Sequence, residues 1–241
     1  MRITAFNSSP RASGGNTYIM VEEFLGGAKE AGADVKHVLL AEKNIKHCLG
    51  CFACWLKTQG KCVIKDDMEV LLNEFIDSDI VVFATPLYVD NVTAIMKGFM
   101  DRIIPIVEPR IEEDEQGESR HPLRFGKSPK IVVISNCGFP GQKNFQVLKL
   151  LFKRIARNMS SEVMAQIYRD EGELLRRHPL ILKPLIWNYK RLLRKAGKEI
   201  VVNSKVSDET ISQLGKPLIA EKDYIKGANQ AFEKLLSETK T

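Results

Sequence analysis

The chain has 241 residues, of which 44% are hydrophobic and 27% charged, and its formal net charge is +6. This balance is typical of a globular protein built as one main domain with an extension, and no stretch approaches the roughly 20 apolar residues that a membrane span needs. The N-terminus, MRITAFNSSP, lacks the features of a secretory signal and begins with strand-like sequence. We therefore expect a cytoplasmic protein without a transmembrane segment.

Strand-like and helix-like segments alternate along the first 170 residues. The apolar patterns predict five strands at 3–7, 34–40, 80–86, 130–138 and 162–169. They predict helices at 16–32, 66–79, 91–104 and 144–159. This alternation is typical of an α/β protein with a doubly wound parallel sheet, for which we predict the strand order 2-1-3-4-5. Ligands bind such sheets beyond the carboxyl ends of the strands, so the loops after residues 7, 84 and 136 are the candidate site.

The pattern changes after residue 170. The sequence becomes basic, contains Pro179 and Pro184, and ends in an amphipathic helix with Leu185, Ile186, Leu192 and Leu193 on one face. We therefore divide the chain into a domain of residues 1–170 and a helical extension of residues 171–241, which we expect to pack on the domain or on a second subunit. The positive charge gathers here without a nucleic-acid-binding motif, so we expect no nucleic-acid partner.

The loop after the first strand, NSSPRASGGNT, is dense in hydroxyls and glycines and has no acidic residue before Glu22. Because a helix N-terminus attracts anions, we expect this loop to bind a phosphate monoester. The expected contributors are Arg11 and the hydroxyls of Ser8, Ser9, Ser13 and Thr17. The loop matches neither the phosphate loop of triphosphatases nor the dinucleotide fingerprint. The alternative is a serine-rich turn in which Asn16 or Thr17 only caps the helix.

The loops after the third and fourth strands combine apolar, aromatic and glycine residues. The first offers an apolar wall, an aromatic ring and backbone donors, which suit a flat heteroaromatic ring such as a flavin. Its residues are Thr85, Pro86, Leu87, Tyr88, Val89 and Asn91. The second offers Gly138 and Gly141 for close backbone approach and Phe139 to cover the ring. Cys137, at the end of the strand, is either a small buried apolar side chain or a thiol that contacts the flavin.

Four of the five cysteines fall in the segment HCLGCFACWLKTQGKC, residues 47–62. They are Cys48, Cys51, Cys54 and Cys62, separated by two, two and seven residues. This spacing lets three thiolates converge and returns a fourth to the same place. Three interpretations remain open: a four-iron four-sulfur cluster, a tetrahedral zinc ion, or thiols without metal.

These motifs resemble a known family. NSSPRASGGNT resembles the Gly-Ser-Pro-Arg-x-x-Gly-Asn-Thr phosphate loop of the flavodoxin-like NAD(P)H-dependent FMN reductases, and TPLYVDNVTAIMKGFMDR is similar to their Pro-x-Tyr and Lys-x-Phe-x-Asp-Arg segment. The cysteine segment resembles that of the iron–sulfur flavoproteins within the superfamily. The likeness covers about residues 1–170, and Asn7 stands where the family often has glycine.

The resemblance implies a flavodoxin-like fold and an FMN site. The phosphate of FMN would lie on Ser9, Arg11, Ser13, Asn16 and Thr17. The ring would lie against Pro86 to Asn91 and against Cys137, Gly138, Phe139 and Gly141. Because the flavin carries the redox chemistry, no catalytic acid or base is nominated. The metal ligands would be the four clustered cysteines.

The implied function is that of an FMN-dependent oxidoreductase. It would move electrons from NAD(P)H or a redox protein through FMN, by way of an iron–sulfur cluster bound by four cysteines, to an acceptor, as a homodimer or homotetramer. One alternative is an NAD(P)H-dependent reductase of flavins, quinones or azo compounds without metal. The other is a non-enzymatic binding module in which zinc staples the cysteine loop.

Overall fold

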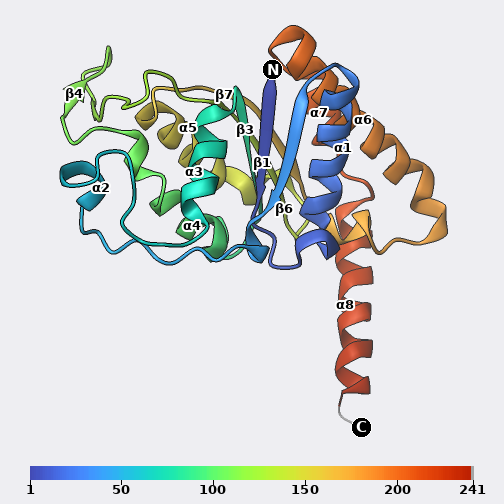
Figure 1. The fold of residues 1–241 in the computed structure, drawn as a ribbon. Coiled ribbons are helices and arrows are strands. Elements are labelled where there is room, and N and C mark those ends of the chain that lie inside the picture. Colours follow the sequence, from blue (N-terminus) through green and yellow to red (C-terminus); the bar gives the residue numbers. More distant parts are fainter. Residues whose placement is uncertain (240–241) are drawn as a thin grey trace.

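The central element of the protein, described here from a computed structural model for residues 1–239, is a parallel sheet of five strands (Figure 1). The strands are β1 (Arg2–Asn7), β2 (Asp34–Leu39), β3 (Ile80–Pro86), β6 (Lys130–Asn136) and β7 (Val163–Arg169). Their spatial order, β2-β1-β3-β6-β7, confirms the predicted order 2-1-3-4-5 and the flavodoxin-like α/β class. The register runs from Ile3 opposite Ile80 to Asn7 opposite Ala84, so these strands end together.

Helices cover both faces of the sheet (Figure 1). The α-helices are α1 (Asn16–Glu30), α2 (Ala53–Leu56), α3 (Met68–Asp77), α4 (Ala94–Asp101), α5 (Gln146–Asn158), α6 (Lys183–Asn203), α7 (Asp208–Leu214) and α8 (Glu221–Glu238). One core cluster joins α1, α6 and α7 to one face, and another joins α3, α4 and α5 to the opposite face. Every side chain of β3 is buried, because both of its faces are covered.

Helix α6 crosses α1 at very short range. A Cβ atom built on Gly27 would lie 1.9 Å from the carbonyl oxygen of Arg194, and one built on Gly197 would lie 1.9 Å from that of Phe24. Pro184 lies in the first turn of α6, where its missing N–H costs nothing. Of the predicted apolar face, Ile186 is buried, whereas Leu185 is 46% exposed. Leu193 is also buried and Leu192 half-buried, so only Leu185 departs from the predicted face, and Tyr189, Ala196 and Ile200 complete the buried stripe.

The last helix, α8, projects from the edge of the sheet where the strands end (Figure 1). None of its residues is buried, and it exposes an apolar stripe formed by Ile225, Phe232, Leu235 and Leu236. No helix in residues 1–239 is both long enough and apolar enough to cross a membrane.

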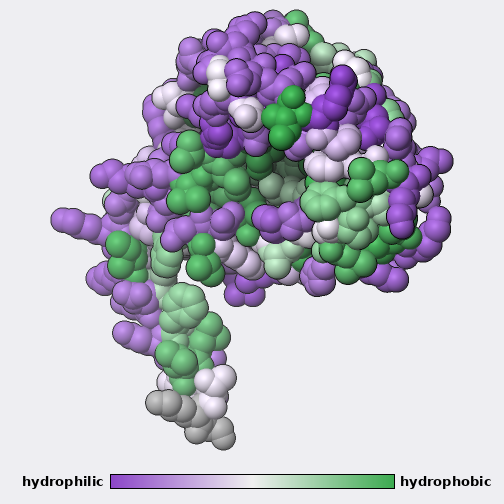
Figure 2. All heavy atoms as spheres, turned by 90° about the vertical axis from the view of Figure 1, so that its left-hand side faces the viewer, coloured by the Kyte–Doolittle hydropathy of each residue, from purple (hydrophilic) through white to green (hydrophobic). Residues whose placement is uncertain are grey.

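Between α4 and β6 the chain leaves the sheet in an excursion with two two-residue strands, β4 (Glu112–Glu113) and β5 (Ser119–Arg120), paired antiparallel. Beside it lies an apolar cleft of about 490 Å³ lined by, among others, Ile103, Ile106 and Met159. Figure 2 shows apolar side chains around a hollow on this side of the molecule. The side chain of Trp55 lies next to the cleft, where it donates to the Ile104 carbonyl oxygen and packs on His121.

Candidate flavin and cysteine sites

The first loop leaves the N-terminus of α1 open to an anion. No side chain caps α1, and its first turn contains no acidic residue, whereas the hydroxyls of Thr93 and Ser207 cap α4 and α7. Gly15 precedes the helix, and a Cβ atom there would lie 2.3 Å from Ser9 Oγ. The free N–H groups and the positive end of the helix dipole therefore face outward, as an anion site requires.

The side chains of Asn7 and Ser8, at the start of this loop, form hydrogen bonds inside the protein. The Asn7 side chain accepts a hydrogen bond from the Ser9 N–H at 2.9 Å, which shapes the turn. The Ser8 hydroxyl is fully buried, donates to the Ala84 carbonyl oxygen at 3.3 Å and accepts from the Thr93 hydroxyl at 2.9 Å. Ser8 was predicted as a ligand residue, but the structure places its hydroxyl behind the loop, where it joins the loops after β1 and β3.

A small cavity of about 90 Å³ brings the three predicted loops together. Its lining residues are Ser9, Arg11, Gly15, Asn16, Thr17, Pro86, Leu87, Tyr88, Asn136, Cys137, Gly138 and Glu173. Of the remaining predicted flavin residues, Ser8, Ser13, Val89, Asn91, Phe139 and Gly141 lie outside this lining. The loops that follow Asn7, Pro86 and Asn136, far apart in the sequence, thus meet at one edge of the sheet, as the topology predicts.

Charged groups from the segment after β7 surround the first loop. Arg11 forms an ion pair with Glu173 at 3.0 Å, and Arg176 donates to the Ser13 and Gly15 carbonyl oxygens at 3.0 and 3.4 Å. The Thr17 hydroxyl accepts from Asn136 at 2.7 Å. Two guanidinium groups and one carboxylate therefore border the entrance, so an arriving phosphate would compete with Glu173 for Arg11.

The second loop turns sharply beside the cavity. Tyr88 and Asn91 exchange two backbone hydrogen bonds of 3.0 Å, with Val89 and Asp90 at positive φ between them. Val89 is 99% exposed, whereas Pro86 is buried and Leu87 half-buried. Asn91 caps its own segment by accepting from the Val92 N–H. The tip of this turn thus presents Val89 and Asp90 to solvent, while Pro86 and Leu87 line the cavity.

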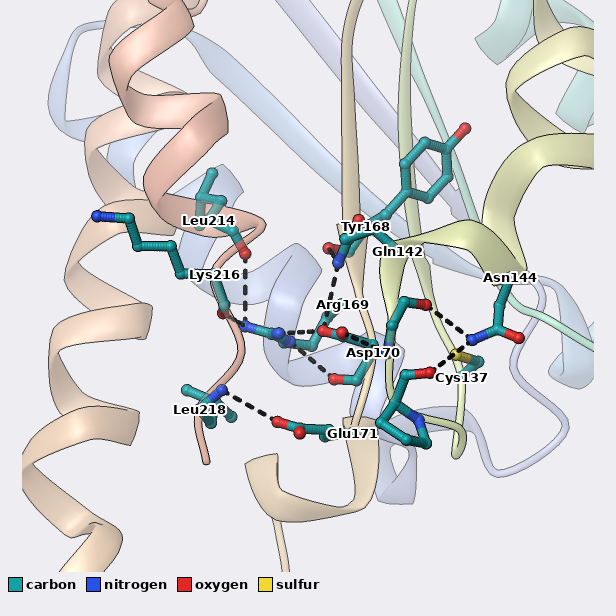
Figure 3. A network of polar contacts seen from close by, with 12 residues as sticks. Cys137, Gln142, Asn144, Tyr168, Arg169, Asp170, Glu171, Leu214, Lys216 and Leu218 are labelled. Atoms are coloured by element: carbon teal, nitrogen blue, oxygen red, sulfur yellow. Dashed lines mark hydrogen bonds and ion pairs between the residues drawn. The ribbon is translucent and has the colours of Figure 1, made fainter. Parts of the chain in front are cut away.

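A buried charged network fixes the third loop (Figure 3). Asp170 and Arg169, at the end of β7, form an ion pair with both side chains nearly fully buried. The second Asp170 oxygen accepts from the Gly141 N–H at 2.8 Å, so the pair holds the loop after β6 in place. Arg169 also donates to the Lys216 carbonyl oxygen at 2.9 Å, which ties the same point to the C-terminal segment.

Glu171 extends this network. Its backbone is left-handed, with φ of 53°, and burial raises the pKa of its carboxyl group. One carboxyl oxygen accepts from the Leu218 N–H at 3.0 Å, and the other has no hydrogen-bond partner in the described part of the chain. Burial also raises the pKa of Tyr224 to about 12, so its hydroxyl stays protonated and donates to the Gly138 carbonyl oxygen at 2.6 Å. The extension therefore contacts the third loop directly.

The Cys137 thiol is expected to resist alkylation. It is buried at the end of β6, and burial raises its pKa to about 11. The neutral thiol contributes its full stabilisation of the folded state at pH values below the pKa of the thiol in the unfolded chain. This contribution is lost as the pH rises through about 11. With iodoacetamide at pH 8, metal-free protein should be labelled at the exposed Cys48 and Cys51 and not at Cys137, as measured by peptide mass spectrometry. Equal labelling of Cys137 in folded protein would contradict this assignment.

The four clustered cysteines line a second, separate cavity of about 30 Å³. Cys54 is buried, Cys62 half-buried, and Cys48 and Cys51 exposed. Burial raises the pKa of Cys54, and negative charge on the other three cysteines would raise it further. The two cavities share no lining residue.

The donor set of the second cavity consists of four thiols. In residues 1–239, no group of three or more His, Cys, Asp or Glu side chains is arranged to hold a metal ion. A single zinc would need four sulfurs at about 2.3 Å from one point. In a four-iron cluster each cysteine binds a different iron, so the thiolates lie farther apart around a larger body. The four cysteines of this cavity are a donor set that suits either group.

Several residues of these sites were not predicted. Asn136 and Glu173 line the candidate flavin cavity, Asp170 holds the loop beside it, and Arg102 lines the cysteine cavity. The run Arg169, Asp170 and Glu171 had a usable signal, since charged residues directly after a buried strand lie at the carboxyl edge. Arg102 is the last residue of the Lys-x-Phe-x-Asp-Arg segment, but at the end of an amphipathic helix a charge is ordinarily solvated, so its place in the cysteine cavity was not predicted.

Comparisons with known proteins place the sequence in a family. Residues 1–128 match the family described as NADPH-dependent FMN reductase. An iron–sulfur flavoprotein of Methanocaldococcus jannaschii is 35% identical over 106 residues, which are 44% of this chain and 53% of that protein. One from Archaeoglobus fulgidus is 39% identical over 105 residues, or 44% and 46% of the two chains. The chain spans about half the length of the curated relatives it matches.

Solved structures share the fold. The structure of an FMN-dependent NADH-azoreductase from Bacillus anthracis in complex with FMN superposes with a TM-score of 0.60 over 83% of this chain and 99% of that chain. The sequence identity between the two chains is 16%, so this likeness concerns the fold alone.

Proposed function

The chain belongs to the NADPH-dependent FMN reductase family, and from this premise we propose that it is an FMN-dependent oxidoreductase. It takes electrons from NAD(P)H or a reduced redox protein and passes them through FMN, by way of an iron–sulfur cluster bound by four cysteines, to an acceptor. The observation that carries the proposal is the meeting of an uncapped helix N-terminus, the Tyr88 turn and the Cys137 loop around one cavity.

The first loop would hold the phosphate of FMN. The free N–H groups at the start of α1, the Thr17 hydroxyl and Arg11 supply donors and positive charge, and Gly15 leaves room beside Ser9. When bound, FMN would supply hydride acceptance and the transfer of electrons one or two at a time. Tyr88 and the backbone around Gly138 would orient the ring and exclude water from its edges. In this proposal Ser8 acts indirectly, through the buried hydroxyl bond that joins two loops.

The four clustered cysteines would hold the iron–sulfur cluster. Thiolates are the ligands that such clusters require, and several relatives carry the name iron–sulfur flavoprotein. Cys54 lies on α2, whose position is fixed by the bond from Trp55 to the Ile104 carbonyl oxygen. The pairing would let the protein convert two-electron donation into one-electron delivery. A homodimer or homotetramer in the cytoplasm remains part of the proposal.

The test is anaerobic purification with added FMN, followed by an absorbance spectrum, iron, sulfide and zinc assays, and NADH and NADPH oxidation. The proposal expects tightly bound flavin, iron with equimolar sulfide, and pyridine nucleotide oxidation or reduction by a redox protein. Flavin without iron would leave the metal-free flavin, quinone or azo reductase. Zinc without flavin would favour the non-enzymatic binding module, and the absence of flavin binding would refute the oxidoreductase.

Two single variants separate an FMN site from unspecific flavin binding. Thr17→Val removes a hydroxyl at the phosphate position and should weaken FMN binding by about tenfold, the effect of one hydrogen bond to a charged group. Glu173→Gln removes the carboxylate that competes for Arg11 and should tighten binding. Riboflavin, which lacks the phosphate, should respond to neither change. Equal responses of FMN and riboflavin would place the phosphate elsewhere.

A further inference from the structure

A buried guanidinium group lies at the wall of the cysteine cavity. Arg102 follows the last residue of α4, and its side chain is only 1% exposed. It lines the cavity together with the four clustered cysteines, and among the described lining residues it is the only charged one apart from any thiolate. A buried arginine needs a reason, because an unbalanced charge in the interior is costly.

The arginine is anchored on the side away from the sulfurs. Its two terminal nitrogens donate to Asp66 at 2.7 and 3.0 Å, and one of them also donates to the Lys46 carbonyl oxygen at 2.6 Å. The Asp66 side chain is fully buried and does not line the cavity. The ion pair is therefore oriented, with its negative end behind the wall and its positive end at the cavity.

One donor of this group remains unused. Arg102 Nε is buried and has no hydrogen-bond partner within residues 1–239. Arg102 and Cys62 line the same cavity. Cys62 is also the cysteine separated from the other three by the longest loop, so it needs an external fixed point more than they do.

We propose that Arg102 positions Cys62 and raises the reduction potential of the iron–sulfur cluster, an inference that rests on the proposed function. A cluster bound by four thiolates is anionic, and reduction adds one further negative charge. An N–H donor and the positive end of a buried ion pair stabilise the reduced form more than the oxidised form. Arg102 thus acts through the Cys62 sulfur and exchanges no proton or electron itself.

The decisive variant exchanges both members of the pair, Arg102→Gln with Asp66→Asn, so that no unbalanced charge stays buried. Anaerobically loaded protein is titrated with dithionite and mediator dyes while the cluster absorbance is followed. At a fixed potential the reduced-to-oxidised ratio should fall about tenfold, which is about 59 mV for a one-electron couple. Arg102→Lys keeps the charge and loses Nε, so its shift should be smaller and in the same direction.

The matched control is a second, mostly buried ion pair elsewhere in the protein. Arg157 and Asp114 are 2.8 Å apart and away from both cavities that the proposal uses, so Arg157→Gln with Asp114→Asn should leave the potential unchanged. Iron loss in the first double variant, with circular dichroism and FMN binding intact, would also support the positioning role. If that variant keeps its full iron content and its potential, the inference about Arg102 is overturned while the cluster itself stands. If the double variant does not fold, the same result in Arg102→Lys overturns the inference. Wild-type protein that takes up no iron would overturn the cluster as well.

Discussion

Asp170→Asn should lower the free energy of unfolding by about 3–5 kcal/mol, the usual cost of leaving one member of a buried ion pair without its partner. Arg169 is completely buried, so water cannot replace the lost carboxylate. Its other contacts, to the carbonyl oxygens of Asp170, Leu214 and Lys216 and to the Tyr189 ring, provide only partial dipoles. Urea unfolding followed by circular dichroism measures the change.

The same substitution has a second expected readout. The Asp170 carboxylate accepts from the Gly141 N–H and from the Gln142 amide, so its loss should loosen the third flavin loop and weaken FMN binding. Asp77→Asn is the control, because Asp77 is 62% exposed and lies 3.8 Å from Arg2. An exposed pair of this kind contributes about 1 kcal/mol or less. A loss below about 1 kcal/mol for Asp170→Asn would mean that the carbonyl oxygens alone balance Arg169.

The second large effect is expected for Gly197→Ala, which should lower the free energy of unfolding by about 3 kcal/mol. The new methyl group would lie 1.9 Å from the Phe24 carbonyl oxygen and 2.8 Å from the Ala28 nitrogen, and both are backbone atoms that cannot rotate away. Overpacking of a core typically costs about 1–3 kcal/mol, and here α6 must also withdraw from α1. Thermal unfolding followed by circular dichroism tests this.

Gly227→Ala provides the matched helical control. Gly227 lies on the exposed helix α8, and nothing approaches the position of its missing Cβ within 4 Å. Alanine stabilises a helix by up to about 1 kcal/mol relative to glycine, so this variant should gain slightly. If Gly197→Ala behaved like Gly227→Ala, the close crossing of α1 and α6 would be wrong.

The sheet could be predicted because its strands are marked locally. The apolar runs ending at Asn7, Pro86 and Asn136 are almost fully buried strands, and parallel pairing brings their ends together without further information. The three loops of the flavin cavity followed from this rule. The orientation of individual side chains did not follow, since Ser8 turns inward only because Thr93, 85 residues away, offers its hydroxyl.

Residues whose role depends on distant partners could not be predicted. Arg102 and Asp66 are 36 residues apart, and each alone is an ordinary charged residue near a helix end. Glu173 reaches Arg11 across 162 residues. The close crossing of α6 with α1 could not be predicted for the same reason, because it depends on Gly27 and Gly197, which are 170 residues apart. The spacing of apolar residues along the chain gives no information about these pairs.

The hydroxyl bond between Ser8 and Thr93 also bears on the thermodynamics of ligand recognition. It joins the loop after β1 to the loop after β3 in the free protein, so the two parts of the candidate site are already held at a fixed separation. A ligand that spans both then loses little conformational entropy of the protein on binding, because the loops need no mutual ordering. A phosphate fragment and a phosphate-free ring fragment should therefore gain affinity when they are linked in one ligand. A Thr93→Val protein should lose this gain, although Thr93 lies outside the residues that line the cavity.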